Sequence, residues 1–181
     1  RIQAVITDVD GTLMPFGTNT PLSQGNTAAL QRAMDAGFHV CLATGRIPGQ
    51  WSEDLRALLP GLGPGVFSNG ALVMGRDGQL LYEACLPQES IVAVRGYAQG
   101  GRAGGGARLA VLAAVPWKGS KATTPMQYLE LAPDGPTRFT ALVRAADEPL
   151  ELVQDVDKIG DQVAKFLIFT EAGKAGWAEM S

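Results

Sequence analysis

Apolar and amphipathic segments alternate along the first seventy residues of this chain, in an order that predicts strands separated by helices. Apolar runs at 4–6, 38–43 and 66–67 are typical of strands buried on both faces. Apolar positions at helical spacing fall between them, over 23–37 and 51–59. This β-α-β-α-β order predicts a parallel sheet with right-handed crossovers, so the carboxyl ends of its strands should lie along one edge.

The two predicted helices have recognisable boundaries and apolar faces. Ser23 can cap the first helix, because its hydroxyl can accept a hydrogen bond from the N–H groups of the first turn, and Gly37 supplies the stop. The positions expected to face the core are Leu30, Ala33 and Met34 in the first helix, and Trp51, Leu55, Leu58 and Leu59 in the second.

Polar residues follow each predicted strand. Asp8 and Asp10 come after the first strand, and Gly11 allows a sharp turn there. Residues 44–46 follow the second strand and residues 68–71 follow the third. Open α/β sheets bind ligands beyond the carboxyl ends of their strands, and hydroxyl and backbone N–H groups there suit a phosphate.

The two carboxylates are a candidate catalytic pair. One can attack an electrophile and form an ester or acyl-phosphate, while the other exchanges protons with the leaving group and with water. Two acids this close repel each other, so a divalent cation or a hydrogen-bond network should neutralise them, and oxygen ligands suit Mg²⁺. A solvated Asp-Gly turn fits the same residues, with Thr44 as a helix cap and Arg46 as a surface charge. The convergence of these groups on one edge favours a site.

The pattern changes after residue 71. Runs at 72–74 and 79–82 flank a Gly-Arg-Asp-Gly turn and predict a hairpin. Beyond it we expect an α+β lobe with helices over 87–99 and 149–156 and strands over 108–115, 139–143 and 165–170. Two stretches are interpreted as surface loops: the glycine-rich residues 100–106, which lack phosphate-loop spacing, and the segment with Trp117, Lys118 and Lys121.

Composition and charge argue against several classes of protein. Hydrophobic residues make up 46% and charged residues 18% of the 181 residues, which is enough apolar sequence for a sizeable core. The net charge is −3, the pI is about 5.1 and no basic stripe is present, so nucleic acid is not an expected partner. No apolar run has the length of a membrane span, and the start carries no signal-peptide pattern.

Cysteine and histidine usage adds little further chemistry. Cys41 and Cys85 form no CxxC motif, which favours a reducing cell interior. The compartment could be the cytoplasm, or an organelle reached through a targeting segment that was later removed. His39 has no neighbouring Cys or acidic cluster, so a Ser-His-Asp or Cys-His mechanism has no support. We expect a soluble intracellular protein without a membrane partner.

Three motifs resemble those of one enzyme family. The stretches D-V-D-G-T-L at 8–13, A-T-G-R at 43–46 and S-N-G-A at 68–71, in this order, are similar to the haloacid dehalogenase superfamily. The resemblance is closest to its Cof-type sugar-phosphatase branch, subfamily IIB. It implies a Rossmann-like parallel-sheet core with an inserted α+β cap. We therefore expect the N-terminal part of the core over 1–84 and the cap over 85–181.

The resemblance also implies roles for the acidic pair. It makes Asp8 the phosphoryl-accepting nucleophile and an Mg²⁺ ligand. It makes Asp10 the general acid and base, with its backbone carbonyl on the metal. The implied activity is Mg²⁺-dependent hydrolysis of a small organic phosphate, such as a sugar phosphate, through an aspartyl-phosphate. A phosphoryl transfer within a mutase shares the same pair and stays open.

The remaining motif residues are implied to bind the substrate. The Thr44 hydroxyl would contact the phosphate beside Gly45, and Arg46 and Asn69 would lie near the substrate or the closed cap.

Two later features of the family have no match in register within these residues. Family members carry, after the cap, a phosphate-binding Lys and a G-D-x-x-N-D loop. Gly160-Asp161 is interpreted as a cap loop, and Lys158 and Lys165 as solvated charges. A degenerate or truncated member with a binding or structural role is therefore the alternative. We also expect an uncovered apolar edge at residues 2–7, to be covered by further sequence or by another chain.

Overall fold

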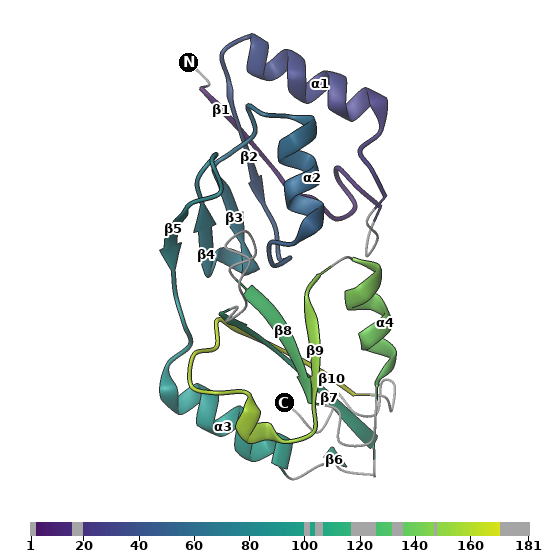
Figure 1. Ribbon diagram of the computed structural model, residues 1–181, viewed down its shortest axis with the longest axis vertical. Coiled ribbons are helices and arrows are strands. Elements are labelled where there is room, and N and C mark those ends of the chain that lie inside the picture. The colour runs from purple at the N-terminus through teal and green to yellow at the C-terminus, as the bar shows by residue number, and fades with distance from the viewer. Residues whose placement is uncertain are drawn as a thin grey trace.

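The computed structural model describes residues 3–15, 20–99, 102–103, 107–116, 126–131, 136–146 and 148–170. It is a mixed α/β structure with two sheets, which lie one beyond the other along the long axis (Figure 1). The first sheet has the order β1-β2-β3-β4-β5, and the second has the order β10-β7-β8-β9, with β6 paired to β7.

The first sheet begins with the predicted parallel unit. Strands β1 (Ala4–Thr7), β2 (His39–Ala43) and β3 (Gly65–Phe67) run parallel. Thr7 pairs with Leu42 and Ala43 with Val66, so the three strands end side by side. Strands β4 (Leu72–Met74) and β5 (Leu80–Glu83) then form the predicted hairpin and complete the sheet in antiparallel sense.

Strand β1 lies at an edge of this sheet, and the prediction that it is buried was wrong. Within the described residues it pairs only with β2, and Val5 and Ile6 are 37% and 69% exposed. Among the described residues, no second strand therefore pairs with its free edge, and its apolar side chains are only partly covered. The uncovered edge that we expected is present in the described part of the chain, and what covers it stays a prediction.

Helices α1 (Gln24–Asp35) and α2 (Gln50–Leu58) lie beside the first sheet (Figure 1). The Ser23 hydroxyl accepts a hydrogen bond from the Asn26 N–H at 3.1 Å, which confirms the predicted cap. Gly37 follows the helix with a φ of 84°, a left-handed conformation that glycine adopts without strain. Leu58 is half exposed, so the predicted apolar face of α2 is one residue too wide.

The second sheet is mostly antiparallel. Strands β6 (Arg102–Ala103), β7 (Ala107–Pro116), β8 (Met126–Leu131) and β10 (Lys165–Thr170) pair in antiparallel sense, and β9 (Leu150–Val153) runs parallel to β8. Helix α3 (Gln88–Gln99) packs on one face with Val111 and Ala113 of β7. Helix α4 (Arg138–Ala145) packs on the other, with Leu112 and Ala114.

Two elements of this second lobe were predicted in the wrong state. Residues 139–143 belong to helix α4, because Phe139 and Val143 share its buried face and Thr137 caps it. Residues 150–153 form β9 rather than a helix, because pairing with Tyr128 to Leu131 of β8 determines their conformation. A 3-10 turn over Val156–Lys158 follows. The loop residues Trp117, Lys118 and Lys121, and most of 100–106, lie outside the described residues.

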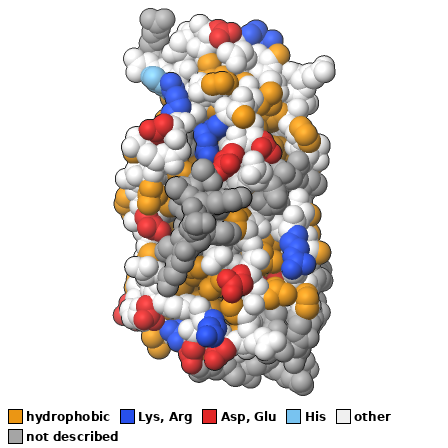
Figure 2. Space-filling model, viewed as in Figure 1, with side chains coloured by type: hydrophobic (Ala, Val, Ile, Leu, Met, Phe, Trp, Pro, Cys, Tyr) orange, Lys and Arg blue, Asp and Glu red, His pale blue; other side chains and the backbone are white. Residues whose placement is uncertain are grey.

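The apolar core joins the two lobes of the structure, each of which consists of one sheet and its helices. One buried cluster contains residues of the first sheet and its helices, such as Leu42 and Trp51, together with Leu112 and Tyr128 of the second sheet. A second cluster lies between α3 and its face of the second sheet. The face shown in Figure 2 carries acidic and basic side chains interspersed with apolar ones. Among the described helices, none combines the length and the apolar character that crossing a membrane requires.

Candidate active site

The loops that follow β2 and β3 are held together by backbone hydrogen bonds. The Thr44 N–H donates to the Val66 carbonyl at 2.9 Å and the Ser68 N–H to the Arg46 carbonyl at 2.9 Å. The Asn69 N–H donates to the Thr44 carbonyl at 3.2 Å. The structure therefore brings together the polar residues that follow these two strands.

The loop after β1 leaves both carboxylates accessible to solvent. Val9 is fully buried, whereas Asp8 is exposed and Asp10 is half-buried. Gly11 has a φ of 75°, and its N–H donates to the Met14 carbonyl at 2.7 Å, which closes the predicted sharp turn.

Asp10 forms a bidentate ion pair with Arg46. The guanidinium Nε and Nη2 donate to the two carboxylate oxygens at 2.8 and 2.6 Å. Arg46 is only 5% exposed and its guanidinium lies 5.2 Å from the centroid of the buried Trp51 ring. Burial lowers the pKa of Arg46, but its hydrogen bonds to Asp10 and the charges of Asp10, Glu148 and Asp8 outweigh burial and raise it. Arg46 is therefore buried beside Asp10, and the alternative interpretation of Arg46 as a surface charge was wrong.

The other substrate-binding candidates lie on or against the loop that carries Arg46. Thr44 is buried, and its hydroxyl accepts a hydrogen bond from the Arg46 N–H at 3.1 Å. Asn69 packs against Gly45, where a Cβ would lie 3.2 Å from the Asn69 amide nitrogen. Ser68 and Asn69 have φ values of 52° and 58°, which L-residues rarely adopt and which are found preferentially at functional sites. The buried Ser68 hydroxyl has no hydrogen-bond partner among the described residues.

Lys165 reaches this site from the second lobe, and its prediction as a solvated charge was wrong. Its ammonium group donates to the Gly45 carbonyl at 2.6 Å and lies 3.4 Å from Oδ1 of Asn69. It also lies 5.6 Å from the centroid of the Tyr128 ring. Burial lowers the pKa of Lys165, and the Glu148 charge offsets part of that effect. Lys158, in contrast, is exposed as expected.

Glu148 is the second side chain that sequence reasoning missed. Its Oε1 accepts a hydrogen bond from the Ile47 N–H at 2.8 Å. Burial raises the pKa of Glu148 to about 7, although the Ile47 hydrogen bond and the charges of Lys165 and Arg46 act in the opposite direction. These contacts join residues about a hundred positions apart, and no local pattern signals them.

Comparison with known proteins identifies the family. A family described as haloacid dehalogenase-like hydrolase matches residues 5–104. The chain belongs to this family. The match includes all three motifs, and it confirms the resemblance that they suggested.

Solved structures of the haloacid dehalogenase superfamily share the fold. A haloacid dehalogenase-like hydrolase from Bacteroides thetaiotaomicron is 22% identical, with a TM-score of 0.69 over 97% of this chain and 60% of its own. A subclass IIB sugar phosphatase of the superfamily is 20% identical, with a TM-score of 0.63 over 92% of this chain and 58% of its own. The chain spans about 60% of the length of these structures, and the likeness concerns the fold.

One curated protein is also similar in sequence. It is named endoribonuclease YBEY, chloroplastic, from Arabidopsis thaliana, and it is 33% identical over 97 residues. The aligned segment covers 49% of this chain and 16% of that protein. So small a share gives no reason to transfer the ribonuclease name.

The family is generally Mg²⁺-dependent, and the donor set of the site is suitable in kind but incomplete. Mg²⁺ prefers about six oxygen ligands in octahedral geometry, and carboxylate and carbonyl oxygens suit it. Asp8 and the backbone carbonyl of Asp10 could supply two. Both carboxylate oxygens of Asp10 are bonded to Arg46. The described residues contain no group of three or more His, Cys, Asp or Glu side chains that could hold a metal ion. They do not make a complete Mg²⁺ site on their own.

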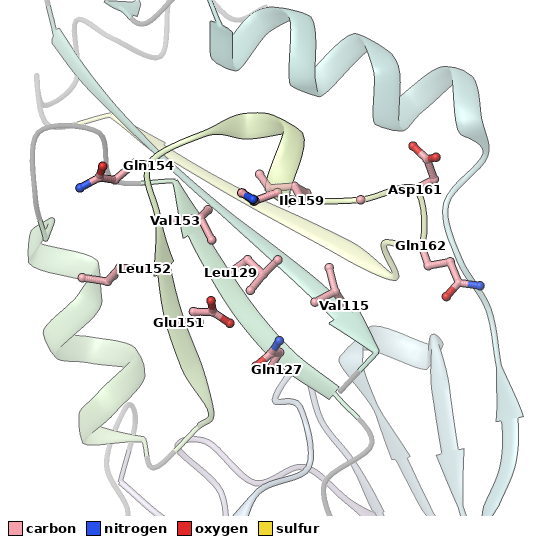
Figure 3. A pocket seen from close by; sticks show the side chains of 12 residues that line it. Val115, Gln127, Leu129, Glu151, Leu152, Val153, Gln154, Ile159, Asp161 and Gln162 are labelled. Carbon is pink, nitrogen blue, oxygen red and sulfur yellow. The ribbon is translucent and has the colours of Figure 1, made fainter. Parts of the chain in front are cut away.

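A separate hollow of about 690 Å³ lies in the second lobe (Figure 3). Its floor is formed by Val115, Leu129 and Val153 of the second sheet, and Ile159 and Asp161 lie on the loop beside it. None of the predicted site residues lines it.

Proposed function

We propose that the protein is an Mg²⁺-dependent phosphomonoester hydrolase that acts on a small organic phosphate such as a sugar phosphate. The observation that carries this proposal is the position of Asp8 and Asp10 at the end of β1, beside the buried Thr44 and Arg46. Acids, a hydroxyl and a fixed cation at one sheet edge are suited to positioning a phosphoryl group and offsetting its charge. Sugar phosphatase activity in a superfamily member of similar fold agrees with it.

In this proposal the two acids divide the chemistry. An Asp8 oxygen bonds to phosphorus while the bond from phosphorus to the alcohol oxygen breaks, and Asp10 gives the leaving alcohol a proton. Water then attacks the phosphorus of the aspartyl-phosphate and Asp10 takes the proton from that water, while the bond from phosphorus to the Asp8 oxygen breaks, which releases inorganic phosphate and restores the Asp8 carboxylate. Arg46 donates one hydrogen bond to each oxygen of Asp10, and the second lone pair of each oxygen can still give or take a proton.

The other groups bind the phosphate and shield it from bulk water. The Thr44 hydroxyl and the Gly45 backbone N–H hold the phosphate oxygens, and Arg46 and Asn69 border the bound substrate. Mg²⁺, when bound by Asp8 and the Asp10 carbonyl, supplies positive charge that lowers the repulsion between the carboxylates and the phosphate. Residues 1–84 form the N-terminal part of the core in this proposal, and residues 85–181 form a cap that excludes bulk water.

The test is hydrolysis of p-nitrophenyl phosphate by the complete protein, with and without Mg²⁺. Asp8→Asn should abolish turnover without loss of fold, and Asp10→Asn should slow it by about 10²–10⁴-fold. Asp35→Asn is the matched control, because Asp35 is exposed on α1. Wild-type turnover in Asp8→Asn would remove Asp8 as the nucleophile.

A second candidate is a binding role without turnover. Two observations favour it: Arg46 occupies both oxygens of Asp10, and the described residues offer no third acidic metal ligand. Calorimetric titration with inorganic phosphate separates the two. Binding of phosphate without Mg²⁺-dependent hydrolysis would support the second candidate.

A further inference from the structure

The second lobe bonds to three consecutive residues of the loop that follows β2. Lys165 Nζ donates to the Gly45 carbonyl at 2.6 Å. Arg46 Nη1 donates to the Ala146 carbonyl at 3.4 Å, and the Ile47 N–H donates to Oε1 of Glu148 at 2.8 Å. Backbone hydrogen bonds fix one side of this loop to the loop after β3, and these three bonds fix its other side to the second lobe.

All three bonds have a charged partner, and in two of them that partner is a partly buried side chain of the second lobe. An ammonium on a carbonyl and a carboxylate on an N–H are roughly twice as strong as neutral hydrogen bonds. Lys165 also contacts Asn69, and Asn69 packs directly on Gly45. The same side chain therefore joins the loop after β2 to the loop after β3.

The bonds surround the candidate phosphate contact. Thr44 precedes Gly45 directly, and its hydroxyl accepts from the N–H of Arg46, the residue that holds Asp10. Any shift of Gly45 or Ile47 would move both Thr44 and Arg46. Misplacement of about 1 Å can cost a site two orders of magnitude in rate.

We propose that Lys165 and Glu148 are positioning residues, which clamp the 44–47 loop in its phosphate-binding conformation when the second lobe is seated on the first. The clamp deepens the proposed function, because it assigns the phosphate affinity of the loop to two side chains of the other lobe. Neither side chain needs to touch the substrate.

The first test measures amide hydrogen exchange of the full 181-residue chain by mass spectrometry. Lys165→Met should raise exchange of the 42–48 segment about tenfold, the size expected when one charge-assisted hydrogen bond is lost. Exchange in α1 should not change. Lys158→Met is the matched control, since Lys158 lies on the same lobe and is exposed. Equal exchange of 42–48 in the parent and in Lys165→Met would overturn the clamp.

The second test is calorimetric titration with inorganic phosphate. Lys165→Met should weaken binding about tenfold, Lys165→Arg should restore most of it because a guanidinium can also donate to a carbonyl, and Lys158→Met should match the parent. Phosphate binding that is the same in the parent and in Lys165→Met would overturn the clamp and leave the proposed function standing.

The experiments also distinguish the case in which the proposed function fails but the clamp exists. If the parent neither binds phosphate nor hydrolyses p-nitrophenyl phosphate, the proposed function fails, and the exchange measurement still decides whether Lys165 holds the loop. Glu148→Leu provides a second variant should Lys165→Met fold poorly. It removes the acceptor of the Ile47 N–H and should raise exchange at 42–48 by a similar factor.

Discussion

The two sheets contribute different kinds of groups to the candidate site. The first sheet supplies it from strand ends, where Asp8 and Thr44 follow β1 and β2 directly and backbone groups of Gly45 and Ile47 point outward to partners. The second sheet supplies long charged side chains, Lys165 from the start of β10 and Glu148 from just before β9. The candidate catalytic and binding groups lie on short loops, next in sequence to their own strands. The side chains that fix those loops come from the second lobe.

The largest effect should come from breaking the buried ion pair of the first lobe. Arg46→Met leaves the Asp10 carboxylate without its bidentate partner, and removal of one member of a buried pair costs about 3–5 kcal/mol. Urea unfolding should show this loss, while Arg32→Met, which is exposed on α1, should change stability by less than about 0.5 kcal/mol. Adding Asp10→Asn to Arg46→Met should recover part of the loss, and no recovery would contradict the pairing energy.

The matching test in the second lobe removes a buried carboxylate. Glu130 is fully buried in β8, and its oxygens accept from the Thr137 hydroxyl and the Thr140 hydroxyl, each at 2.6 Å. Glu130→Ala leaves these donors and the first turn of α4 without their acceptor, which should destabilise the protein by about 2–4 kcal/mol. Chemical denaturation measures this loss of stability, and Glu151→Ala is the control because Glu151 is exposed. Phosphate binding should survive at low denaturant, in contrast to Lys165→Met.

The smallest effect concerns the pH dependence of the link between the lobes. Glu148, which interacts with Lys165, Arg46 and Asp10, has its pKa raised by burial from 4.5 to about 7. The folded state therefore holds a proton that the unfolded chain releases. The resulting stabilisation is complete below about pH 4.5 and is lost as pH rises through about 7, by about 1–3 kcal/mol.

Glu148→Gln stays neutral at every pH and still offers an oxygen to the Ile47 N–H. Its free energy of unfolding should change less between pH 5 and pH 8 than that of the parent, as measured by urea unfolding at both pH values. An identical pH dependence in the two proteins would show that Glu148 does not titrate in this range.

The sequence predicted those features that neighbouring residues determine. Ser23 caps α1 because the N–H groups it satisfies are three residues away, and Gly37 ends that helix through its own backbone. The strand-end motifs were found for the same reason, since each lies next to its own strand. Tertiary partners determine the rest. Ile6 is apolar but exposed because no described strand covers it. Residues 139–143 are helical because Phe139 and Val143 have helical spacing and because Thr137 caps the helix.

The loop at residues 44–47 has a consequence for the order of folding. Its bonds to Ala146, Glu148 and Lys165 close chain loops of 100, 101 and 120 residues. Contacts of such high sequence separation form slowly, after local elements have paid most of their ordering entropy. During synthesis the first sheet and its helices can assemble as soon as β5 has left the ribosome, but Gly45 finds its partner only when Lys165 emerges. The conformation of this loop, which we propose binds phosphate, is therefore among the last features that this chain acquires.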